Sequence, residues 1–189
     1  MQTTPIIRAG RNRRRRKTLF PKLPLTPTQY RWVSLLIFLA VPLVSFSIVE
    51  ILNYNNPFTS FTPLQVVLNL VWYYLGEAFF YFLRGGRPVA AAKWSLGFAW
   101  GLGMANHYII SFRGRTLFPG DLLTLRTAAN VAGNYDYTPD QTQVLCTVIM
   151  GACMAVLLLM PREERRPWPW RRFAVTAAGT AVYLVVFFG

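Results

Sequence analysis

Residues 32–52, WVSLLIFLAVPLVSFSIVEIL, contain a single ionisable side chain, that of Glu50. Because a helix rises about 1.5 Å per residue, a helix of this length crosses the roughly 30 Å hydrocarbon core of a bilayer. The apolar stretch is longer than the core of a signal peptide, and a long segment precedes it. Residues 32–52 are therefore predicted to form an uncleaved transmembrane helix.

Four further apolar stretches follow, at residues 64–83, 89–110, 141–160 and 173–189. The last stretch is at the short edge of the length that spans a bilayer. Residues 1–31 are different in character, because they hold nine of the 20 Lys and Arg residues and several prolines. The sequence thus predicts an all-α membrane protein, with a basic tail over residues 1–31 and a bundle of five transmembrane helices over residues 32–189.

The composition of the 189 residues excludes three other classes of protein. A hydrophobic content of 53% is too high for a disordered basic chain. Two cysteines are too few for a disulfide-stapled secreted domain. A nucleic-acid-binding domain would account for the net charge of +13 but not for the apolar content.

The distribution of Lys and Arg predicts the orientation in the membrane. With the N-terminus in the cytoplasm, 17 of these residues lie on the inner side and three lie on the outer side. Such an excess on the cytoplasmic side is typical of membrane proteins, and it places Gly189 at the outer face. The run from Arg13 to Lys17 is expected to contact anionic lipid of the inner leaflet rather than nucleic acid.

Polar side chains inside the spans are candidates for a site, because ionisable groups are costly in a bilayer. The predicted topology places Glu50, Asn69, Asn106 and His107 at a similar depth, near the outer interface. They can form a pocket for a lipid headgroup. Alternatively, Glu50 and His107 lie among hydrated headgroups and bond to each other or to water.

Two other features are expected to stabilise the bundle. Glu77 lies deeper in its span and is predicted to make an interhelical hydrogen bond. Gly97, Gly101 and Ala105 follow one another at four-residue spacing, which favours the close approach of a neighbouring helix.

No constellation of catalytic or metal-binding residues is visible. The chain has one histidine, and it lacks the HExxH, CxxC, P-loop and dinucleotide-binding patterns. Asp121, Asp136 and Asp140 are too scattered to propose a metal site. We therefore predict no catalytic, cofactor-binding or metal-binding residue in this chain.

The loop after the third span is expected to contain a short amphipathic helix over residues 121–132, lying on the outer membrane surface. Asp121 follows a Pro-Gly pair and can cap its N-terminus, and Gly133 can end it. Arg113 and Arg126 would then be able to meet a lipid phosphate. The alternative is that this helix only seals the bundle.

The same loop carries a resemblance to a known family. Residues 112–123 are FRGRTLFPGDLL, and residues 129–135 are ANVAGNY. This pattern resembles the loop in the membrane domain of lipoteichoic acid synthase-like proteins, which are sulfatase-like phosphoglycerol transferases of Gram-positive bacteria. The matching residues are Arg113, Gly114, Pro119, Asp121, Leu122, Asn130, Gly133, Asn134 and Tyr135.

The resemblance implies that the chain is the N-terminal membrane anchor of a headgroup transferase at the outer face of the cell membrane. In that family, an extracellular domain of the alkaline phosphatase superfamily transfers glycerol phosphate from phosphatidylglycerol to a cell wall polymer. That domain carries a threonine nucleophile and a divalent metal, usually manganese. We expect it to be missing from this chain, and the end at Gly189 then marks a fragment.

The alternative is a stand-alone multi-pass membrane protein without catalytic activity. It would be a partner-binding subunit, or a small carrier built round Glu50 and His107.

Overall fold

The computed structural model describes residues 22–116, 120, 137–161, 163 and 170–188. Every regular element of three or more residues in this part of the chain is an α-helix, which confirms the predicted all-α class. The helices are α1 (Pro27–Leu52), α2 (Pro63–Leu83), α3 (Pro88–Arg113), α5 (Gln141–Leu159) and α6 (Trp170–Phe188). Each helix covers one of the five apolar stretches. The amphipathic helix predicted for residues 121–132 lies outside the described residues, and so does the run from Arg13 to Lys17.

Local sequence signals set where the helices begin. Three N-termini are closed by a capping box, in which the first side chain accepts from the backbone N–H three residues on, and a glutamine there accepts in return. The pairs are Thr26 with Gln29, Thr62 with Gln65, and Asp140 with Gln143. The capping box at Thr26 starts α1 before its apolar stretch begins. The predicted tail is therefore too long, because its last residues, from Pro27, are helical.

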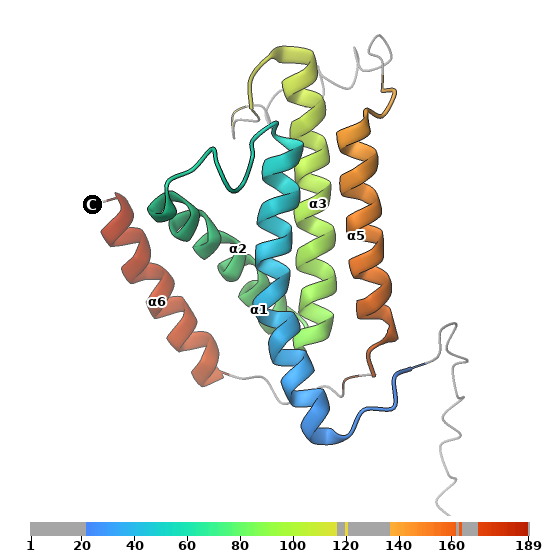
Figure 1. The fold of residues 1–189 in the computed structure, drawn as a ribbon. Coiled ribbons are helices and arrows are strands. Elements are labelled where there is room, and N and C mark those ends of the chain that lie inside the picture. Colours follow the sequence, from blue (N-terminus) through green and yellow to red (C-terminus); the bar gives the residue numbers. More distant parts are fainter. Residues whose placement is uncertain (1–21, 117–119, 121–136, 162, 164–169, 189) are drawn as a thin grey trace, which may run out of the picture.

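Helix α3 lies at the centre of the bundle and contacts α1, α2 and α5. Figure 1 shows α1, α3 and α5 side by side, whereas α2 is inclined to them and α6 packs on α2 alone. The chain reverses direction from each helix to the next. The C-termini of α1 and α3 and the N-terminus of α5 thus meet at one end of the bundle, which we call the His107 end. The opposite end is the Lys22 end.

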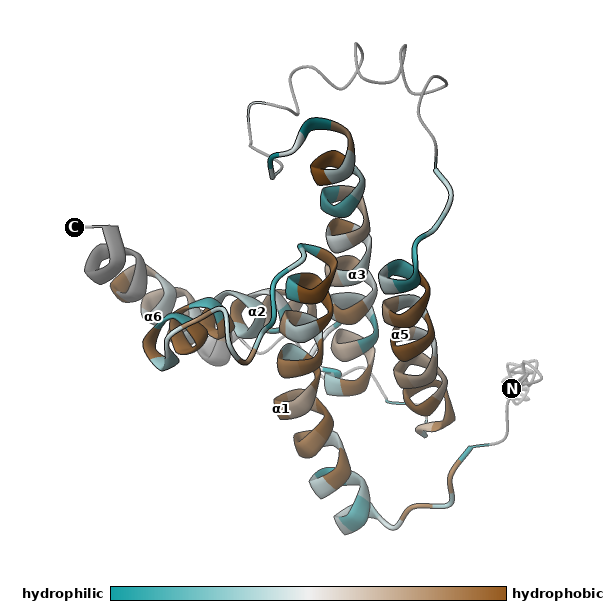
Figure 2. Ribbon diagram, turned by 45° about the horizontal axis from the view of Figure 1, so that its top comes forward, coloured by the Kyte–Doolittle hydropathy of each residue, from teal (hydrophilic) through white to brown (hydrophobic). Residues whose placement is uncertain are grey.

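Three helices, α1, α2 and α5, are long and apolar enough to cross a membrane. Their flanks expose large apolar side chains such as Trp32, Phe79 and Val148, each 62% accessible, and Figure 2 shows apolar residues along the helices with polar ones at their ends. Surfaces of this kind indicate a membrane protein. Helix α3 is as long as α1, but Lys93, Asn106 and His107 lower its hydropathy. In α6 the described apolar stretch is shorter, Phe173–Val182.

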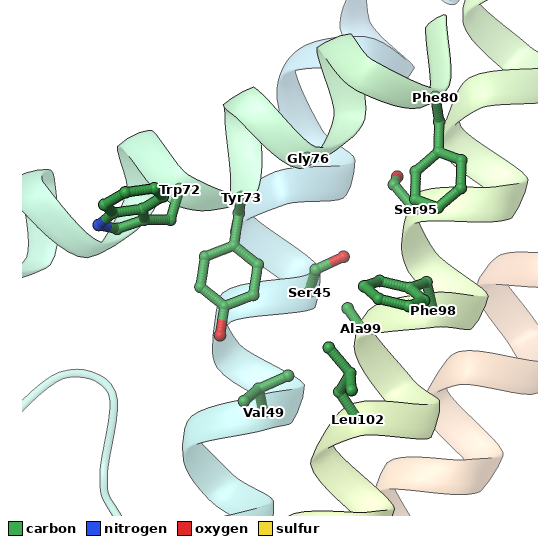
Figure 3. Close-up of a pocket in the computed structure, with 10 residues that line it drawn as sticks. All are labelled: Ser45, Val49, Trp72, Tyr73, Gly76, Phe80, Ser95, Phe98, Ala99 and Leu102. Atoms are coloured by element: carbon green, nitrogen blue, oxygen red, sulfur yellow. The ribbon is translucent and has the colours of Figure 1, made fainter. Parts of the chain in front are cut away.

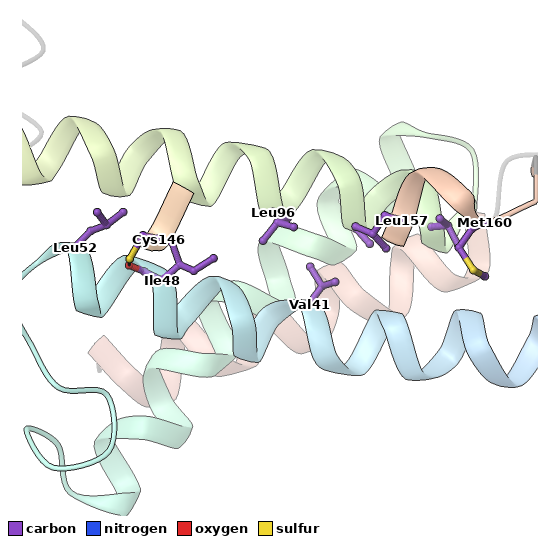
Figure 4. Packing of buried hydrophobic residues seen from close by; sticks show 9 residues of the cluster. Val41, Ile48, Leu52, Leu96, Cys146, Leu157 and Met160 are labelled. Carbon is purple, nitrogen blue, oxygen red and sulfur yellow. Dashed lines mark hydrogen bonds between the residues drawn. The ribbon is translucent and has the colours of Figure 1, made fainter. Parts of the chain in front are cut away.

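The core of the bundle lies between α1, α3 and α5 (Figure 4). Leu52, Leu96 and Cys146 are fully buried there. Both cysteines, Cys146 and Cys153, are free thiols. A continuous apolar core along three helices holds the His107 end in a fixed arrangement.

The close approach of α1 and α3 occurs at Gly103, which the four-residue pattern did not include. A Cβ atom on Gly103 would lie 2.9 Å from Leu52 Cδ1 and 3.4 Å from Val49 Cγ2. By contrast, a Cβ atom on Gly101 would have no atom within 4 Å, and one on Gly97 would reach only Met154 Cε at 3.9 Å. The expectation that Gly97 and Gly101 mediate tight packing is therefore wrong for Gly101, which faces outward.

Candidate functional site

A cluster of polar side chains lies at the His107 end, where three helices meet. Tyr54 follows the C-terminus of α1, His107 lies in the second half of α3, and Asp140 is the N-cap of α5. We call these three residues the His107 cluster. Because the three residues lie in or beside three different helices, the cluster forms only when α1, α3 and α5 pack together.

The hydrogen bonds of His107 hold its ring between α1 and α5. Its side chain is buried, and Nδ1 lies 2.6 Å from the carbonyl oxygen of Leu52. Nε2 lies 3.0 Å from Oδ2 of Asp140. Both ring nitrogens are therefore within hydrogen-bond distance of an oxygen atom, one from each neighbouring helix end.

Asp140 divides its carboxylate between two tasks. Oδ1 accepts from the backbone N–H of Gln143 at 2.7 Å and so caps α5, whereas Oδ2 faces His107. The helix start thus fixes the position of the charge that pairs with the histidine. Asp140 was not predicted as a site residue, although its capping box with Gln143 is visible directly before residues 141–160.

Tyr54 covers the histidine from the side of the α1–α2 loop. Its ring stacks on His107 with centroids 4.7 Å apart and an interplanar angle of 29°. Its hydroxyl lies 3.2 Å from His107 Nε2 and 3.3 Å from Ser111 Oγ, and it can donate to Asp140 Oδ2 at 3.4 Å. Tyr54 has a φ of 62°, a left-handed conformation that is unfavourable for a bulky residue.

Two pairs of side chains extend the polar surface beside the cluster. Asn106 Nδ2 donates to Asn53 Oδ1 at 2.6 Å, and Asn55 Nδ2 donates to Glu50 Oε2 at 2.9 Å. Glu50 therefore bonds to Asn55, and of the two alternatives for Glu50 and His107 a direct bond between them is not formed among the described residues. The separation arises because His107 reaches the carbonyl of Leu52 and the start of α5, away from the Glu50 carboxylate.

The other predicted site residues fall in three places. Arg113 is the exposed last residue of α3, and the exposed Arg115 follows it. Asn69 is half-buried in α2 and is not a partner of His107. Asp121 and Arg126 lie outside the described residues. The structure thus brings Glu50, Asn106, His107 and Arg113 to one end of the bundle.

Glu77 does not make the interhelical hydrogen bond that was predicted. Its side chain is fully buried, and neither carboxylate oxygen has a hydrogen-bond partner among the described residues. The neighbours on its α2 face are mostly aromatic, as in the contact of Tyr81 with Phe38. Position in a span therefore predicted the burial of Glu77 but not its surroundings.

The Lys22 end has a polar contact of its own, centred on Glu163. Its carboxylate accepts from Val89 N at 3.2 Å and from Ala90 N at 2.9 Å, in the first turn of α3. It also accepts from the Tyr30 hydroxyl at 2.6 Å. Helix α3 has no side-chain cap from its own N-cap residue, so Glu163 supplies the missing acceptors.

The described residues do not fit a metal centre. No group of three or more His, Cys, Asp or Glu side chains comes together in the part of the chain that the structure describes. His107 and Asp140 are only two side chains, and both are already engaged in hydrogen bonds.

Comparison with known proteins adds no relative to these observations. No protein-family model matches the chain, and no curated protein or solved structure matches it significantly.

Proposed function

We propose that the chain is the membrane domain of a lipoteichoic acid synthase-like headgroup transferase, and that its His107 end receives a phospholipid headgroup at the outer face of the cell membrane. The single observation that carries this proposal is that Arg113 and Arg115 are exposed at the end of the bundle where Tyr54, His107 and Asp140 come together. His107 is six residues, or about 9 Å along α3, from Arg113, which is the first arginine of the FRGR stretch at residues 112–115.

The charges at this end suit an anionic headgroup. Arg113 and Arg115 are exposed on the same side of the bundle and supply positive charge. Asn53, Asn55 and Tyr54 offer donors suited to the hydroxyl groups of a glycerol headgroup. Phosphatidylglycerol combines both features, and it is the lipid that the family resemblance implies.

The proposal includes five membrane crossings with a cytoplasmic N-terminus. The 17 basic residues assigned to the inner side and the reversal of direction at every helix support this topology. Helix α3 is as long as α1 and packs against α1, α2 and α5, and its most polar ring, that of His107, is buried among them rather than facing lipid. Catalysis itself is assigned to a domain outside this chain.

The single histidine allows a direct test of headgroup binding. His107 is the only histidine of the chain, so ring-labelled histidine reports on this site alone in an NMR spectrum. The purified chain would be placed in nanodiscs of phosphatidylcholine and titrated with phosphatidylglycerol. We expect a saturable shift of the His107 ring signals, and no shift with added diacylglycerol, which lacks the phosphate.

A pair of arginine variants separates headgroup binding from general attraction to anionic lipid. Arg113→Gln removes a charge near the cluster, and Arg31→Gln removes an exposed charge near the Lys22 end. We expect only Arg113→Gln to weaken the titration. The proposal would be contradicted if the His107 ring signals did not shift with phosphatidylglycerol, or if they shifted equally in both variants.

A further inference from the structure

A cavity lies between α1, α2 and α3, separate from the His107 cluster. Its volume is about 220 Å³. Figure 3 shows its walls, which are almost entirely apolar and include Val49, Gly76, Phe80 and Ala99. An apolar cavity of this size stays dry and accepts an apolar molecule, as an engineered cavity of about 150 Å³ does for benzene.

One buried polar atom faces this cavity without a partner. Ser45 is 3% exposed, and its Oγ has no hydrogen-bond partner among the described residues. Figure 3 shows its side chain pointing from α1 into the space between α2 and α3. A buried hydroxyl without a partner is unfavourable, so the atom indicates a ligand with a matching oxygen.

The other serines of these helices show that this arrangement is particular to Ser45. Ser47 Oγ donates to the carbonyl of Leu43 at 2.9 Å, and Ser95 Oγ donates to that of Ala92 at 3.2 Å. Such bonds to the preceding turn are the usual arrangement of serine in an apolar helix. Ser45 leaves its hydroxyl available to the cavity instead.

The mouth of the cavity opens at the depth of the hydrocarbon. Its rim includes Trp72, Phe98 and Leu102, which are 42%, 58% and 46% exposed and lie well inside their helices. The phase that adjoins the mouth is therefore lipid rather than water. The cavity extends from Leu102 to Ser95, about 10 Å along α3, so an elongated chain fits it better than a compact molecule.

We infer that this cavity binds one acyl chain of a glycerolipid, with the Ser45 hydroxyl donating to the ester carbonyl of that chain. The ester end points toward Val49 and Leu102, nearer the His107 end, and the methylene groups extend toward Phe80 and Phe98. Ser45 lies two turns before Leu52, about 10 Å along α1, so the bound lipid is drawn deeper than its neighbours. The inference rests on the part of the proposed function that places these helices in a bilayer.

The test is photo-crosslinking with a lipid that carries a diazirine in its acyl chain. The purified full chain is reconstituted in phosphatidylcholine vesicles with a small fraction of this probe, irradiated and digested, and the labelled residues are located by mass spectrometry. We expect labelling concentrated on the cavity residues of α1, α2 and α3. Label spread evenly over all lipid-facing helices would overturn the inference.

A matched pair of glycine variants tests the cavity itself. A Cβ atom on Gly76 or on Gly151 meets no other atom within 4 Å, but Gly76 lines the cavity whereas Gly151 lies on the exposed face of α5. We expect Gly76→Leu to reduce labelling of the cavity about tenfold, because the leucine occupies the place of the chain, and Gly151→Leu to leave it unchanged. Equal labelling of both variants would mean that the probe does not occupy the cavity, and it would overturn the inference.

A second pair of variants tests the hydrogen bond without altering the packing. Probes with ester-linked and ether-linked chains differ in the carbonyl that Ser45 would meet. We expect the native chain and Ser47→Ala to prefer the ester probe, and Ser45→Ala to label equally with both. A preference that survives in Ser45→Ala would contradict the assignment of this hydroxyl.

The outcomes of this test and of the headgroup test are distinguishable. Phosphatidylcholine and phosphatidylglycerol probes with identical chains should label the cavity alike, whereas only phosphatidylglycerol should shift the His107 signals. Cavity labelling without any response of His107 would therefore leave the acyl-chain site standing and remove the headgroup site.

Discussion

At the scale of single residues, Tyr54 is held in a conformation that its own backbone disfavours. Among the described residues it is the one non-glycine residue with positive φ, at 62°. Such a conformation costs about 1–3 kcal/mol and persists only where surrounding contacts hold it. The contacts here are the stacked ring of His107 and the polar atoms around the Tyr54 hydroxyl. The strain thus places an aromatic ring over the buried imidazole of His107.

Two substitutions of Tyr54 separate the conformational energy of its positive φ from the energy of its side-chain contacts. Tyr54→Ala and Tyr54→Gly both remove the side-chain contacts, but only glycine adopts positive φ without a steric cost. We expect Tyr54→Gly to be more stable than Tyr54→Ala by about 1 kcal/mol. Unfolding in mixed micelles with increasing denaturing detergent measures the difference. Equal stability would show that the conformation is unstrained.

Asp140 allows its two tasks to be separated by substitution. Asn retains a good N-cap but removes the charge that faces His107, whereas Ala removes both. We expect Asp140→Ala to lower the free energy of unfolding by about 1 kcal/mol more than Asp140→Asn does. Unfolding of the two variants in the same micelles gives the comparison. A smaller loss in Asp140→Ala would contradict the capping role.

A double-mutant cycle measures the pairing itself. In a His107→Gln background, Asp140→Asn should cost less than in the native chain, with a coupling energy of about 1 kcal/mol. Glu163→Gln, at the opposite end of the bundle, is the control and should be additive with His107→Gln. A coupling energy near zero would mean that the 3.0 Å contact contributes nothing to stability.

The sequence predicted which residues lie near one end of the bundle, but not their partners. His107 and Glu50 were expected near the same interface, because both end an apolar span. Their partners depend on how α1 and α5 are rotated about their axes, which the sequence does not reveal. Glu50 and Asn55 are only five residues apart, so their contact does not depend on the packing of one helix against another. Glu50 therefore accepts a hydrogen bond from Asn55, and His107 pairs with Asp140.

At the scale of the helix, hydropathy and capping signals predict where the elements lie. The apolar stretches gave all five helices to within a few residues, and the remaining difference at α1 follows from Thr26 and Pro27. The buried face of each helix was not predictable in the same way. A helix that is apolar on all sides does not mark the side that meets protein, since lipid and protein neighbours are equally apolar.

Gly103 and Gly101 provide a matched test of helix packing. Gly103 lies where α3 meets Leu52 of α1, and Gly101 faces outward on the same helix. We expect Gly103→Leu to lower the free energy of unfolding by about 1–3 kcal/mol through overpacking, and Gly101→Leu to have little effect. Thermal unfolding followed by circular dichroism in detergent compares the two variants. A greater loss in Gly101→Leu would restore the four-residue pattern as the packing face.

At the scale of the whole molecule, the proposed topology makes the two ends of the bundle face different compartments. Single cysteines at Thr59 and Thr138 lie toward the His107 end, and one at Thr28 lies at the Lys22 end; all three positions are exposed. In a background without Cys146 and Cys153, a membrane-impermeant maleimide added to intact cells should label Thr59→Cys and Thr138→Cys but not Thr28→Cys.

Permeabilised cells are the control for that experiment, because all three cysteines should then react. Labelling of Thr28→Cys alone in intact cells would show that the orientation is the opposite of the one proposed. Labelling of Thr59→Cys without Thr138→Cys would mean that the two positions lie on opposite sides, and hence that one of the two helices between them, α2 or α3, does not cross the membrane.

The contact of Glu163 with the start of α3 has a consequence for biosynthesis. Val89 and Glu163 are 74 residues apart, so the ribosome makes the first turn of α3 well before the residue that caps it. At about 5–20 residues per second, this turn is synthesised several seconds before Glu163. Until then its N–H groups lack the carboxylate that accepts from them in the folded chain. The contact of Glu163 with α3 can therefore form only late in synthesis, after α5 has been made.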